Sequence, residues 1–588
     1  MGQNRYFREE LTFLKEQGVE FSKVYPQLSR FLNSRSTDPD VERLLEGFAF
    51  LTGRLREKID DEFPELTHSI INMLWPNYLR QVPSICILKF NPVAKSITEK
   101  QTVKQSTEVE STPVYGTACR YTSCRDVDVY PIDRTTTKTV HSRDSSIVDV
   151  GLQIQNGLKL DQIGLTKLRF FLGGDNYSSE TLYLWLNHHL SKIEIVTNKE
   201  TVSIPKSCLS MVGFDAEDGI LPYPQNVYEG YRVLQEYLSF PVVFKFFDIS
   251  DLNDFLFGDV EGDITLRFVF SKALPSDVRV TDNQFSLYCT PAINLFQHDA
   301  EPIDLNGKRT EYKISPSNRS PSHFEVFSVE GVRGWIDAAQ GKFRGHFREY
   351  QPFESFSHEI ERAKNRVALY YRVRVKEGMT LAGLEHYISF IRGDETACVG
   401  DSEAISLSLT CSNRQLPLEL GVGDIHVATD SSPTFATFEN ITEPTAPIRP
   451  ALDGSLLWTL ISNLSLNYLS ILSKEALSSV IKAYDFRALV DRQAERISKL
   501  RNESIVDIKT SPVEKLIKGL PVRGLKSEIT LDQSAFGSEG ELYLFGSILS
   551  RFFSLYASIN SFHELVVINA NNKERYSWGI QSGEYPLI

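Results

Sequence analysis

Apolar residues recur at helical spacing in the first 84 residues of the chain. Asp38 stands at an N-cap position with Pro39 directly after it, which predicts the start of a helix. A second helix is expected to begin near Asp61 and to stop at Pro76. The apolar positions of the two helices are Val41, Leu44, Leu45, Phe48, Phe50, Leu51, Leu55, Ile59, Leu66, Ile70, Ile71, Leu74 and Trp75. Phe50 and Leu51 widen the apolar stripe beyond one face of the first helix. We therefore expect this segment to pack against another surface.

The pattern changes at Pro83. Residues 85–290 are rich in Thr, Val, Ser, Tyr and Phe and carry frequent turn residues, which predicts a mostly β region. Within it, the segment from Ile264 to Leu274 is expected to open as a strand, because every second residue is apolar. One helix is expected from Ser178 to Ile193, where leucines stand four residues apart.

Residues 291–450 predict a second β-rich region that is punctuated by glycine and proline turns. Its last part, residues 428–450, is polar and carries four prolines, so we interpret it as a linker. The spacing of apolar residues predicts an amphipathic helix over 457–472 directly afterwards.

The C-terminal part predicts a strand over 522–531, a helix with apolar residues from Leu542 to Ile559, and a strand over 564–568. The helix is apolar nearly all round, which indicates burial either in the core of its own domain or against a partner. Phe545 and Phe552 are the candidate contact residues of this helix.

The chain is therefore expected to be a multidomain α+β protein. Its 588 residues suffice for roughly three to five domains. We expect an N-terminal helical segment (1–84), a β-rich domain (85–290), a second β-rich domain ending in the proline-rich linker (291–450) and a C-terminal α+β domain (451–588).

Composition argues against several functions. The 63 Lys and Arg residues are outnumbered by 76 Asp and Glu residues, for a net charge of −13, whereas a nucleic-acid-binding protein needs a basic face. The seven cysteines are irregularly spaced and predict free, mostly buried thiols in a reducing compartment. The N-terminus has no apolar signal segment and no apolar run of about 18 residues occurs, so we expect a cytoplasmic protein without membrane insertion.

No residue pattern indicates a metal site. Cys119 and Cys124 have neither zinc-finger spacing nor a second pair of ligands. His188 and His189 are adjacent, and on an α-helix their rings would diverge by about 100°, which does not suit a shared ion. We therefore predict no metal and no cofactor.

Catalytic motifs are lacking as well. The glycine-containing segments GGDN (173–176) and GVGD (421–424) have no strand–helix setting for phosphate binding, and no nucleophile elbow occurs. Paired glycosidase carboxylates are conceivable in two acidic groups, for which charged, solvated loops are the simpler interpretation: Asp60 with Asp61, and Asp215 with Glu217 and Asp218. The sequence therefore predicts a protein that is not an enzyme.

Five blocks of sequence, in order along the chain, resemble one family. The blocks are RYFREELTFLKEQGVEFSKVYPQLSRFL (5–32), the helical stretch 38–84, GYRVLQEYLSFPVVFKFFDI (230–249), PAINLFQHDAEPIDL (291–305) and the segment 522–567 around SEGELYLFGSILSRFFSLY. In the third block a Glu-Tyr pair precedes Phe-Pro. Together they resemble the TssF family, subunits of the baseplate of the bacterial type VI secretion system.

The resemblance implies a structural function and a set of partners. Two TssF copies and one TssG form a wedge, six wedges surround the VgrG spike hub, and the complex engages TssK and TssE. The ring supports assembly of the sheath and tube, as related wedge proteins of contractile phage tails do. It also implies a cytoplasmic location, docked through the baseplate at the inner-membrane complex of a Gram-negative bacterium.

By the same analogy, the N-terminal helices would join a helical core with TssG, and the C-terminal part would contact a second TssF copy. The candidate interface residues are Leu44, Leu45, Phe48, Leu55, Leu74, Trp75, Phe545 and Phe552. Two other hypotheses stay open: a β-rich, carbohydrate-active enzyme and a module that binds a small ligand. Either should be soluble alone, whereas an assembly subunit should self-associate until a partner covers its apolar faces.

Overall fold

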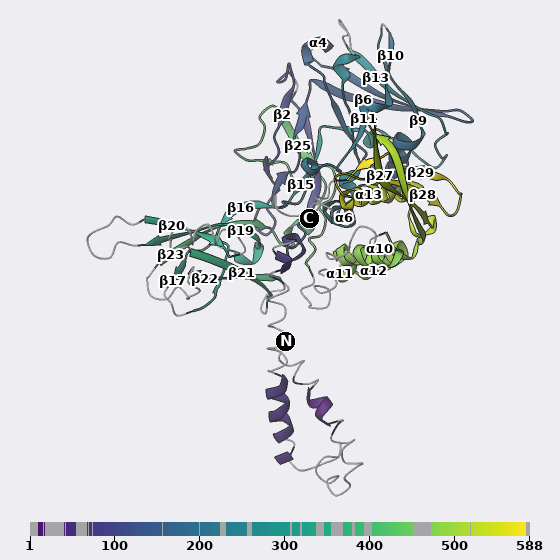
Figure 1. Cartoon of the computed structure of the whole chain (residues 1–588). Helices are drawn as coiled ribbons and strands as arrows, with labels where there is room; N and C mark the ends of the chain where they lie inside the picture. Colours follow the sequence, from purple (N-terminus) through teal and green to yellow (C-terminus); the bar gives the residue numbers. More distant parts are fainter. Residues whose placement is uncertain are drawn as a thin grey trace.

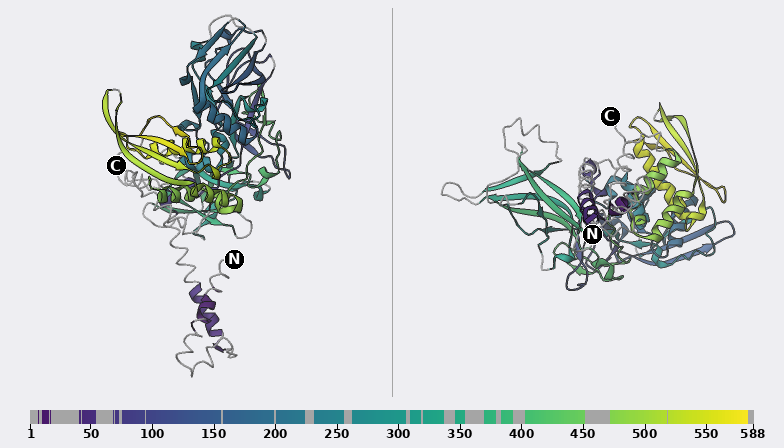
Figure 2. Two further views of the ribbon diagram at one scale, coloured as in Figure 1. Left: turned by 90° about the vertical axis from the view of Figure 1, so that its right-hand side faces the viewer. Right: turned by 90° about the horizontal axis from the view of Figure 1, so that it is seen from below.

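The computed structural model describes most of the chain from residue 75 onward and short helical stretches before it. The described residues are 7, 10–15, 17, 40–41, 43–53, 68, 70–72, 75–93, 95–155, 157–198, 200–223, 231–255, 262–305, 309–317, 320–336, 346–353, 369–378, 383–392, 403–450, 472–517 and 519–583. Figures 1 and 2 show a body built from several sheets, with the helix at 43–53 standing apart from it. Within these described ranges, no helix combines the length and apolarity needed to cross a membrane.

The central sheet unites strands that lie far apart in the sequence. Its order is β24 (Val427–Ala428), β3 (Glu108–Glu110), β4 (Arg120–Ser123), β15 (Cys289–Ile293), β1 (Ile85–Pro92) and β25 (Ala436–Asn440). Strand β1 is antiparallel to both of its neighbours, and Phe90 lies opposite Phe438. Both of these rings are buried.

The prediction of a linker over residues 428–450 is therefore wrong, because this segment completes the central sheet. Its polar residues hydrogen-bond to the backbone of β1: the hydroxyls of Thr442 and Thr445 accept from the amides of Ile87 (2.9 Å) and Ile85 (3.0 Å). Polar residues occur here because they accept hydrogen bonds from the backbone amides of β1, and not because the segment is a solvent-exposed linker.

Two further sheets and a ribbon complete the first β-rich region. One sheet has the order β10 (Thr201–Ile204), β9 (Leu190–Val196), β13 (Asp263–Phe270), β7 (Ser146–Ile154) and β6 (Ile132–His141). The other has the order β11 (Leu209–Val212), β12 (Phe246–Ile249), β8 (Leu168–Phe171) and β14 (Ser286–Leu287), and the ribbon pairs β2 (Gln101–Val103) with β5 (Val127–Val129). The predicted strand from Ile264 is confirmed, with alternate residues of β13 buried.

The helix predicted for Ser178 to Ile193 is shorter than expected. Helix α5 (Asn176–Leu184) begins where the Asp175 carboxylate accepts a hydrogen bond from the Ser178 amide at 2.8 Å. It passes into the π-helical turn η3 (Trp185–His189), and strand β9 follows at Leu190. The leucine spacing misled because Leu190 is buried in the sheet opposite Phe270.

The second β-rich region has a sheet and a hydrophobic core of its own. The sheet order is β16 (Phe296–Asp299), β23 (Glu403–Ser412), β19 (Glu325–Ile336), β20 (His346–Pro352), β21 (Leu369–Glu377), β22 (Leu384–Arg392) and β18 (Tyr312–Lys313), and β17 (Ile303–Leu305) also pairs with β23. Its core residues all lie between Phe296 and Cys411. This module projects from one side of the body in Figure 1.

The chain enters and leaves this module at one joint. Asn294 and Asn413 are both buried, and the Asn413 amide donates to the side-chain oxygen of Asn294 at 2.7 Å. In return the Asn294 side chain donates to the side-chain oxygen of Asn413 at 2.8 Å, which also accepts from the amide of Arg120 at 3.0 Å. The paired asparagines fasten the module to strand β4 of the central sheet.

The C-terminal part contains the predicted strand, helix and strand in order, together with helices and strands that the sequence did not predict. Helices α10 (Lys474–Tyr484), α11 (Phe486–Val490) and α12 (Arg492–Glu503) precede strands β26 (Ile505–Ile517) and β27 (Leu520–Leu531), helix α13 (Glu539–Tyr556), and strands β28 (Phe562–Asn569), β29 (Arg575–Ser577) and β30 (Gln581–Ser582). The two predicted strands and the helix between them are confirmed. The helix predicted over 457–472 lies outside the described residues apart from Leu472.

Short helical elements connect the sheets. They are η2 (Pro76–Tyr78), α4 (Leu160–Ile163), η4 (Lys206–Cys208), η5 (Ala216–Asp218), α6 (Arg232–Ser239), η7 (Pro241–Phe244), η8 (Leu252–Asp254), η9 (Asp282–Gln284), η10 (Pro321–His323), η11 (Leu416–Glu419) and η12 (Gln533–Ala535). The fold is thus a multidomain mixture of helix and strand, as predicted. One large hydrophobic cluster joins the 71–82 segment, the first β-rich region and the C-terminal part.

Candidate functional site

The N-terminal helix at residues 43–53 carries an unusual amount of exposed apolar surface. Leu44 is 74% exposed, Leu51 61%, Phe48 56% and Phe50 50%. Leu45 is half-buried on the same helix. Covering the exposed part of these four side chains is worth roughly 4–7 kcal/mol, since full burial of one is worth about 1.5–3 kcal/mol. Surface of this kind indicates a site for protein–protein contact.

The other predicted interface residues have different surroundings. Trp75 is 1% exposed, and its ring packs against the rings of Tyr223 (5.3 Å) and Tyr231 (5.6 Å). Phe545 and Phe552, both fully buried in α13, lie 5.9 Å from Tyr237 and 6.0 Å from Tyr231, respectively. All three side chains are covered by their own chain. For Phe545 and Phe552 this agrees with one of the two alternatives given for α13, burial in the core of its own domain. Leu55 and Leu74 lie outside the described residues.

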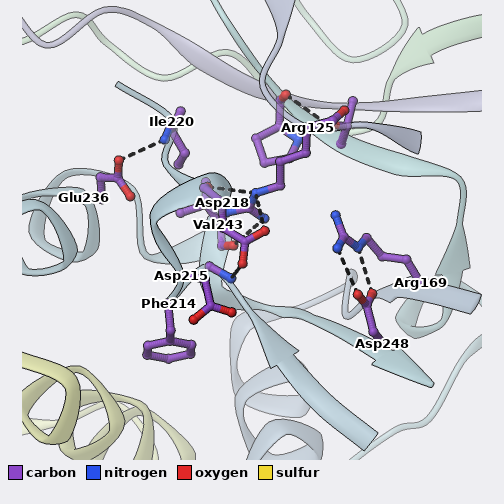
Figure 3. Close-up of polar contacts among 12 residues, drawn as sticks. Arg125, Arg169, Phe214, Asp215, Asp218, Ile220, Glu236, Val243 and Asp248 are labelled. Carbon is purple, nitrogen blue, oxygen red and sulfur yellow. Dashed lines mark hydrogen bonds and ion pairs between the residues drawn. The ribbon is translucent and has the colours of Figure 1, made fainter. Parts of the chain in front are cut away.

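A charged cleft of about 750 Å³ is the second notable feature, and the sequence did not predict it. Arg125, which lines it, is buried: its Nε donates to the carbonyl of Asp218 (3.0 Å) and its Nη1 to that of Val243 (3.3 Å), as Figure 3 shows. Burial lowers the pKa of the Arg125 guanidinium, and the charge of Asp218 opposes that shift. Other lining residues include Lys100, Lys104, Lys167, Arg169, Arg232, Asp126, Asp128 and Glu217.

Ion pairs fix the walls of this cleft. Arg169 in β8 donates two hydrogen bonds to Asp248 in β12, at 2.7 and 2.9 Å (Figure 3). The two residues lie opposite each other in the strand register, which gives the planar, two-point geometry that arginine and carboxylate favour. Lys167 adds a third contact to the same carboxylate at 3.2 Å.

One predicted acidic group has a structural role in this region. The Asp218 carboxylate accepts from the amide of Gly213 at 2.8 Å and faces Arg125 at 3.9 Å. The interpretation of Asp215, Glu217 and Asp218 as a solvated loop therefore fails for Asp218, whereas Asp215 and Glu217 are exposed. The second acidic group, Asp60 with Asp61, lies outside the described residues.

Comparisons with known proteins decide the family. A family model described as "Type VI secretion system, TssF" matches residues 2–585. The chain belongs to the TssF family. It is 27% identical over 629 residues to the type VI secretion system component TssF1 of Pseudomonas aeruginosa, with 99% of each chain covered.

Chains in solved type VI secretion baseplate structures share its fold. The chain is similar to one in a TssK–TssF–TssG baseplate subcomplex of the type VI secretion system, determined by cryo-electron microscopy, with a TM-score of 0.78 and 29% identity over 93% of this chain and 99% of that one. It is also similar to a chain in a baseplate complex of the type VI secretion system, with a TM-score of 0.62 and 27% identity over the full length of both.

The Glu-Tyr pair in the third TssF-like block has a clear structural reason. Glu236 in α6 is fully buried, and one carboxylate oxygen accepts from the amides of Ile220 (2.9 Å, Figure 3) and Leu221 (3.3 Å). Arg232 donates to the other oxygen at 3.1 Å. Tyr237 packs under the guanidinium of Arg501 at 5.4 Å. Only the four-residue spacing of Arg232 and Glu236 was available in the sequence as a signal for this buried pair.

Proposed function

We propose that this chain is a structural, non-enzymatic subunit of a type VI secretion baseplate. In this proposal two copies join one TssG-like partner in a wedge, and wedges surround a VgrG-like spike hub and support assembly of sheath and tube. TssK and TssE are the further proposed partners, and the assembly docks from the cytoplasm at the inner-membrane complex.

The exposed apolar helix at residues 43–53 carries this proposal. Leu44, Phe48 and Leu51 each keep more than half of their side-chain surface exposed, and the similar solved chain belongs to a complex that contains TssG and TssK. A helix with a broad apolar face docks most simply against other helices, where its side chains fill grooves between them. We propose that Leu44, Leu45 and Phe48 form this contact with the TssG-like partner.

Co-expression with the TssG-like protein of the same source tests the proposal. Native mass spectrometry of the purified complex should give two copies of this chain per partner. Leu45→Asp and Phe48→Asp should each abolish the complex at micromolar concentration, because an aspartate would be buried without a compensating charge.

Leu418→Asp provides a matched control, since Leu418 is a 51%-exposed apolar residue on the η11 turn of the body. It should leave the complex intact. If the wild-type chain remained a soluble monomer beside its partner, the wedge proposal would be refuted and the enzyme and ligand-binding hypotheses would return.

A further inference from the structure

Two consecutive histidines lie on the π-helical turn η3, where strand β9 meets the C-terminal part of the chain. On an α-helix adjacent rings would diverge by about 100°, which does not suit a shared ion, but residues 185–189 form a π turn. A π turn is rare and is frequently found at functional sites. The imidazole rings of His188 and His189 have centroids 4.8 Å apart and an angle of 74° between their planes.

A carboxylate from a distant part of the sequence completes a cluster with these rings. Glu574 lies in the turn between β28 and β29. One ligand atom from each of His188, His189 and Glu574 can be chosen so that all three lie within 4.8 Å of one another. These residues are far apart in sequence, so the fold and not local spacing brings them together.

The buried Nε2 atom of His189 is the observation that points to a ligand. This residue is 7% exposed, and Nε2 has no hydrogen-bond partner within the described part of the chain. The nearest carboxylate oxygen, on Glu574, lies 3.6 Å away, which is too long for a hydrogen bond. Buried polar atoms normally have a hydrogen-bond partner. Because the Nε2 atom of His189 lacks one and lies beside two other potential metal ligands, a bound ion is the partner that would explain it.

Neighbouring groups hold the three side chains in place. The indole of Trp185 packs 4.8 Å from the ring of His189, and the ring of Tyr576 lies 5.0 Å from that of His188. Lys272 donates to the second oxygen of Glu574 at 3.0 Å, which leaves the first oxygen facing His189. Supporting contacts of this kind orient metal ligands in known sites.

The local charge balance suits a cation. Lys272 contributes one positive charge, whereas Glu574 and Glu539 contribute two negative charges. Glu539 belongs to this group because it accepts a hydrogen bond from the hydroxyl of Tyr576 at 2.5 Å. Two neutral imidazoles within a net negative environment attract a divalent ion.

We propose that His188, His189 and Glu574 bind a divalent transition-metal ion of the zinc class, and that this ion ties the turn before β9 to the C-terminal β28–β29 turn. Two imidazole nitrogens and one carboxylate oxygen are typical ligands of Zn²⁺, with water in a fourth position. Tetrahedral ligands at about 2.0–2.1 Å lie roughly 3.3 Å apart. The ligand atoms here lie within 4.8 Å of one another, so binding requires them to approach by up to about 1.5 Å.

Titration of the full-length chain with ZnCl₂ tests this site. The chain should be purified with a tag that contains no histidine and stripped with a chelator before calorimetry. We expect one Zn²⁺ per chain with a dissociation constant of micromolar or below. His188→Gln and Glu574→Gln should each weaken binding at least tenfold, and His426→Ala, which removes an exposed histidine of the body, should leave it unchanged.

A second measurement on the wild-type chain removes any dependence on the folding of the variants. Diethylpyrocarbonate modification followed by mass spectrometry should show Zn²⁺-dependent protection of His188, with His426 modified equally with and without the ion. The chain loaded with Co²⁺ in place of Zn²⁺ should show the absorption bands of a cobalt ion bound by nitrogen and oxygen ligands. It should show no bands from a thiolate ligand. Equal modification of His188 in both states, or Zn²⁺ affinity unchanged by both Gln substitutions, would overturn the proposal.

Discussion

At the scale of single residues, the cysteines illustrate how burial controls chemistry. The six described cysteines, all except Cys398, are buried and free. Burial raises the pKa of Cys119, Cys124, Cys289 and Cys411 to about 12, so at neutral pH these side chains are protonated thiols. The thiolate is the reactive form, and these residues are therefore structural. The sequence predicted free, mostly buried thiols from the odd number and irregular spacing of the cysteines in a large chain.

Thiol labelling checks this interpretation. A Cys398→Ser variant should show no fast reaction with Ellman's reagent at pH 8 while the chain is folded, and six equivalents after denaturation in guanidinium. The free thiols react only when unfolding brings them into water. Rapid labelling of any of the six in the folded chain would contradict the structure.

His563 gives the chain a defined response to acid. It is fully buried in β28, it shares a hydrogen bond of 3.0 Å with the Ser527 hydroxyl, and burial lowers its pKa to about 3. In the unfolded chain the pKa is about 6.5, so between pH 6.5 and 3 the unfolded state binds a proton that the folded state does not. The stabilisation is complete above pH 6.5 and is lost as the pH falls, by up to about 1.4 kcal/mol per pH unit.

The variant His563→Gln should flatten this dependence. Urea midpoints measured at pH 7, 6 and 5 should fall less steeply than in the wild type, because the glutamine cannot be protonated. His426→Gln, at an exposed position, should keep the wild-type slope. Parallel profiles for wild type and His563→Gln would show that this histidine does not govern acid sensitivity.

The predicted interface residues show what sequence can and cannot reveal at this scale. Periodicity identified Leu44, Phe48, Trp75 and Phe545 as apolar helix positions, but it does not state which apolar residue remains exposed. Exposure depends on which distant segments arrive: Tyr223, Tyr231 and Tyr484 cover Trp75, whereas Leu44 and Phe48 remain open. The charged cleft was missed for the same reason, since its walls come from distant strands.

At the scale of elements, helix α13 is held by an unusually close approach to α5. A Cβ atom placed on Gly540 would overlap the backbone carbonyl of Glu180, so the two helices touch at a residue without a side chain. The Ser538 hydroxyl caps α13 by accepting from the amide of Glu541 at 2.9 Å and donates to the Glu180 carboxylate at 2.6 Å. The residues that begin α13 are therefore also the residues that contact α5.

This geometry reverses an ordinary preference. In a helix, alanine is normally favoured over glycine by about 1 kcal/mol, but Gly540→Ala should destabilise the chain by about 1–3 kcal/mol because backbone must move. Gly47→Ala is the matched control: a Cβ there meets nothing within 4 Å, and the helix at 43–53 should gain helicity. Urea unfolding and circular dichroism measure both effects, and stabilisation by Gly540→Ala would refute the close contact.

Sequence patterns predicted the long elements with the strongest apolar period and missed others of similar length, such as α12 and β26. Strands β13, β27 and β28 and helix α13 matched their predicted ranges, because each has a strong apolar period over at least eight residues. The end of α5 was misplaced because a leucine period continued across the π turn into β9. Apolar spacing indicates which residues are buried, but not whether they lie in a helix or in the strand that follows it. Both elements can bury residues that together give one continuous apolar spacing.

At the scale of the whole molecule, the module at 296–411 is an insertion into an otherwise continuous body. It has its own hydrophobic core, and the chain enters and leaves it through the paired asparagines 294 and 413. The predicted boundary at residue 450 was misplaced because the chain returns to the central sheet through β24 and β25. An insertion of this kind is invisible to composition, since both regions are β-rich.

Excision of the module tests its independence. A chain in which a short Gly-Ser segment replaces residues 296–411 should keep the near-ultraviolet circular dichroism of the body and resist limited proteolysis, because the entry and exit points adjoin. Removal of residues 146–270 should instead prevent folding, since it takes β7 and β13 out of a shared core. Aggregation of the first variant would show that the two cores are interdependent.

The position of β1 between β15 and β25 has a consequence for biosynthesis. About 340 residues separate β1 from β25, and at roughly 5–20 residues per second the ribosome needs about 15–70 s to deliver the second partner strand. During this interval one edge of β1 lacks the strand that finally covers it, and an unpaired edge invites pairing with another nascent chain. Efficient production of this protein should therefore depend on holdase chaperones, even though β25 pairs with that edge in the finished chain.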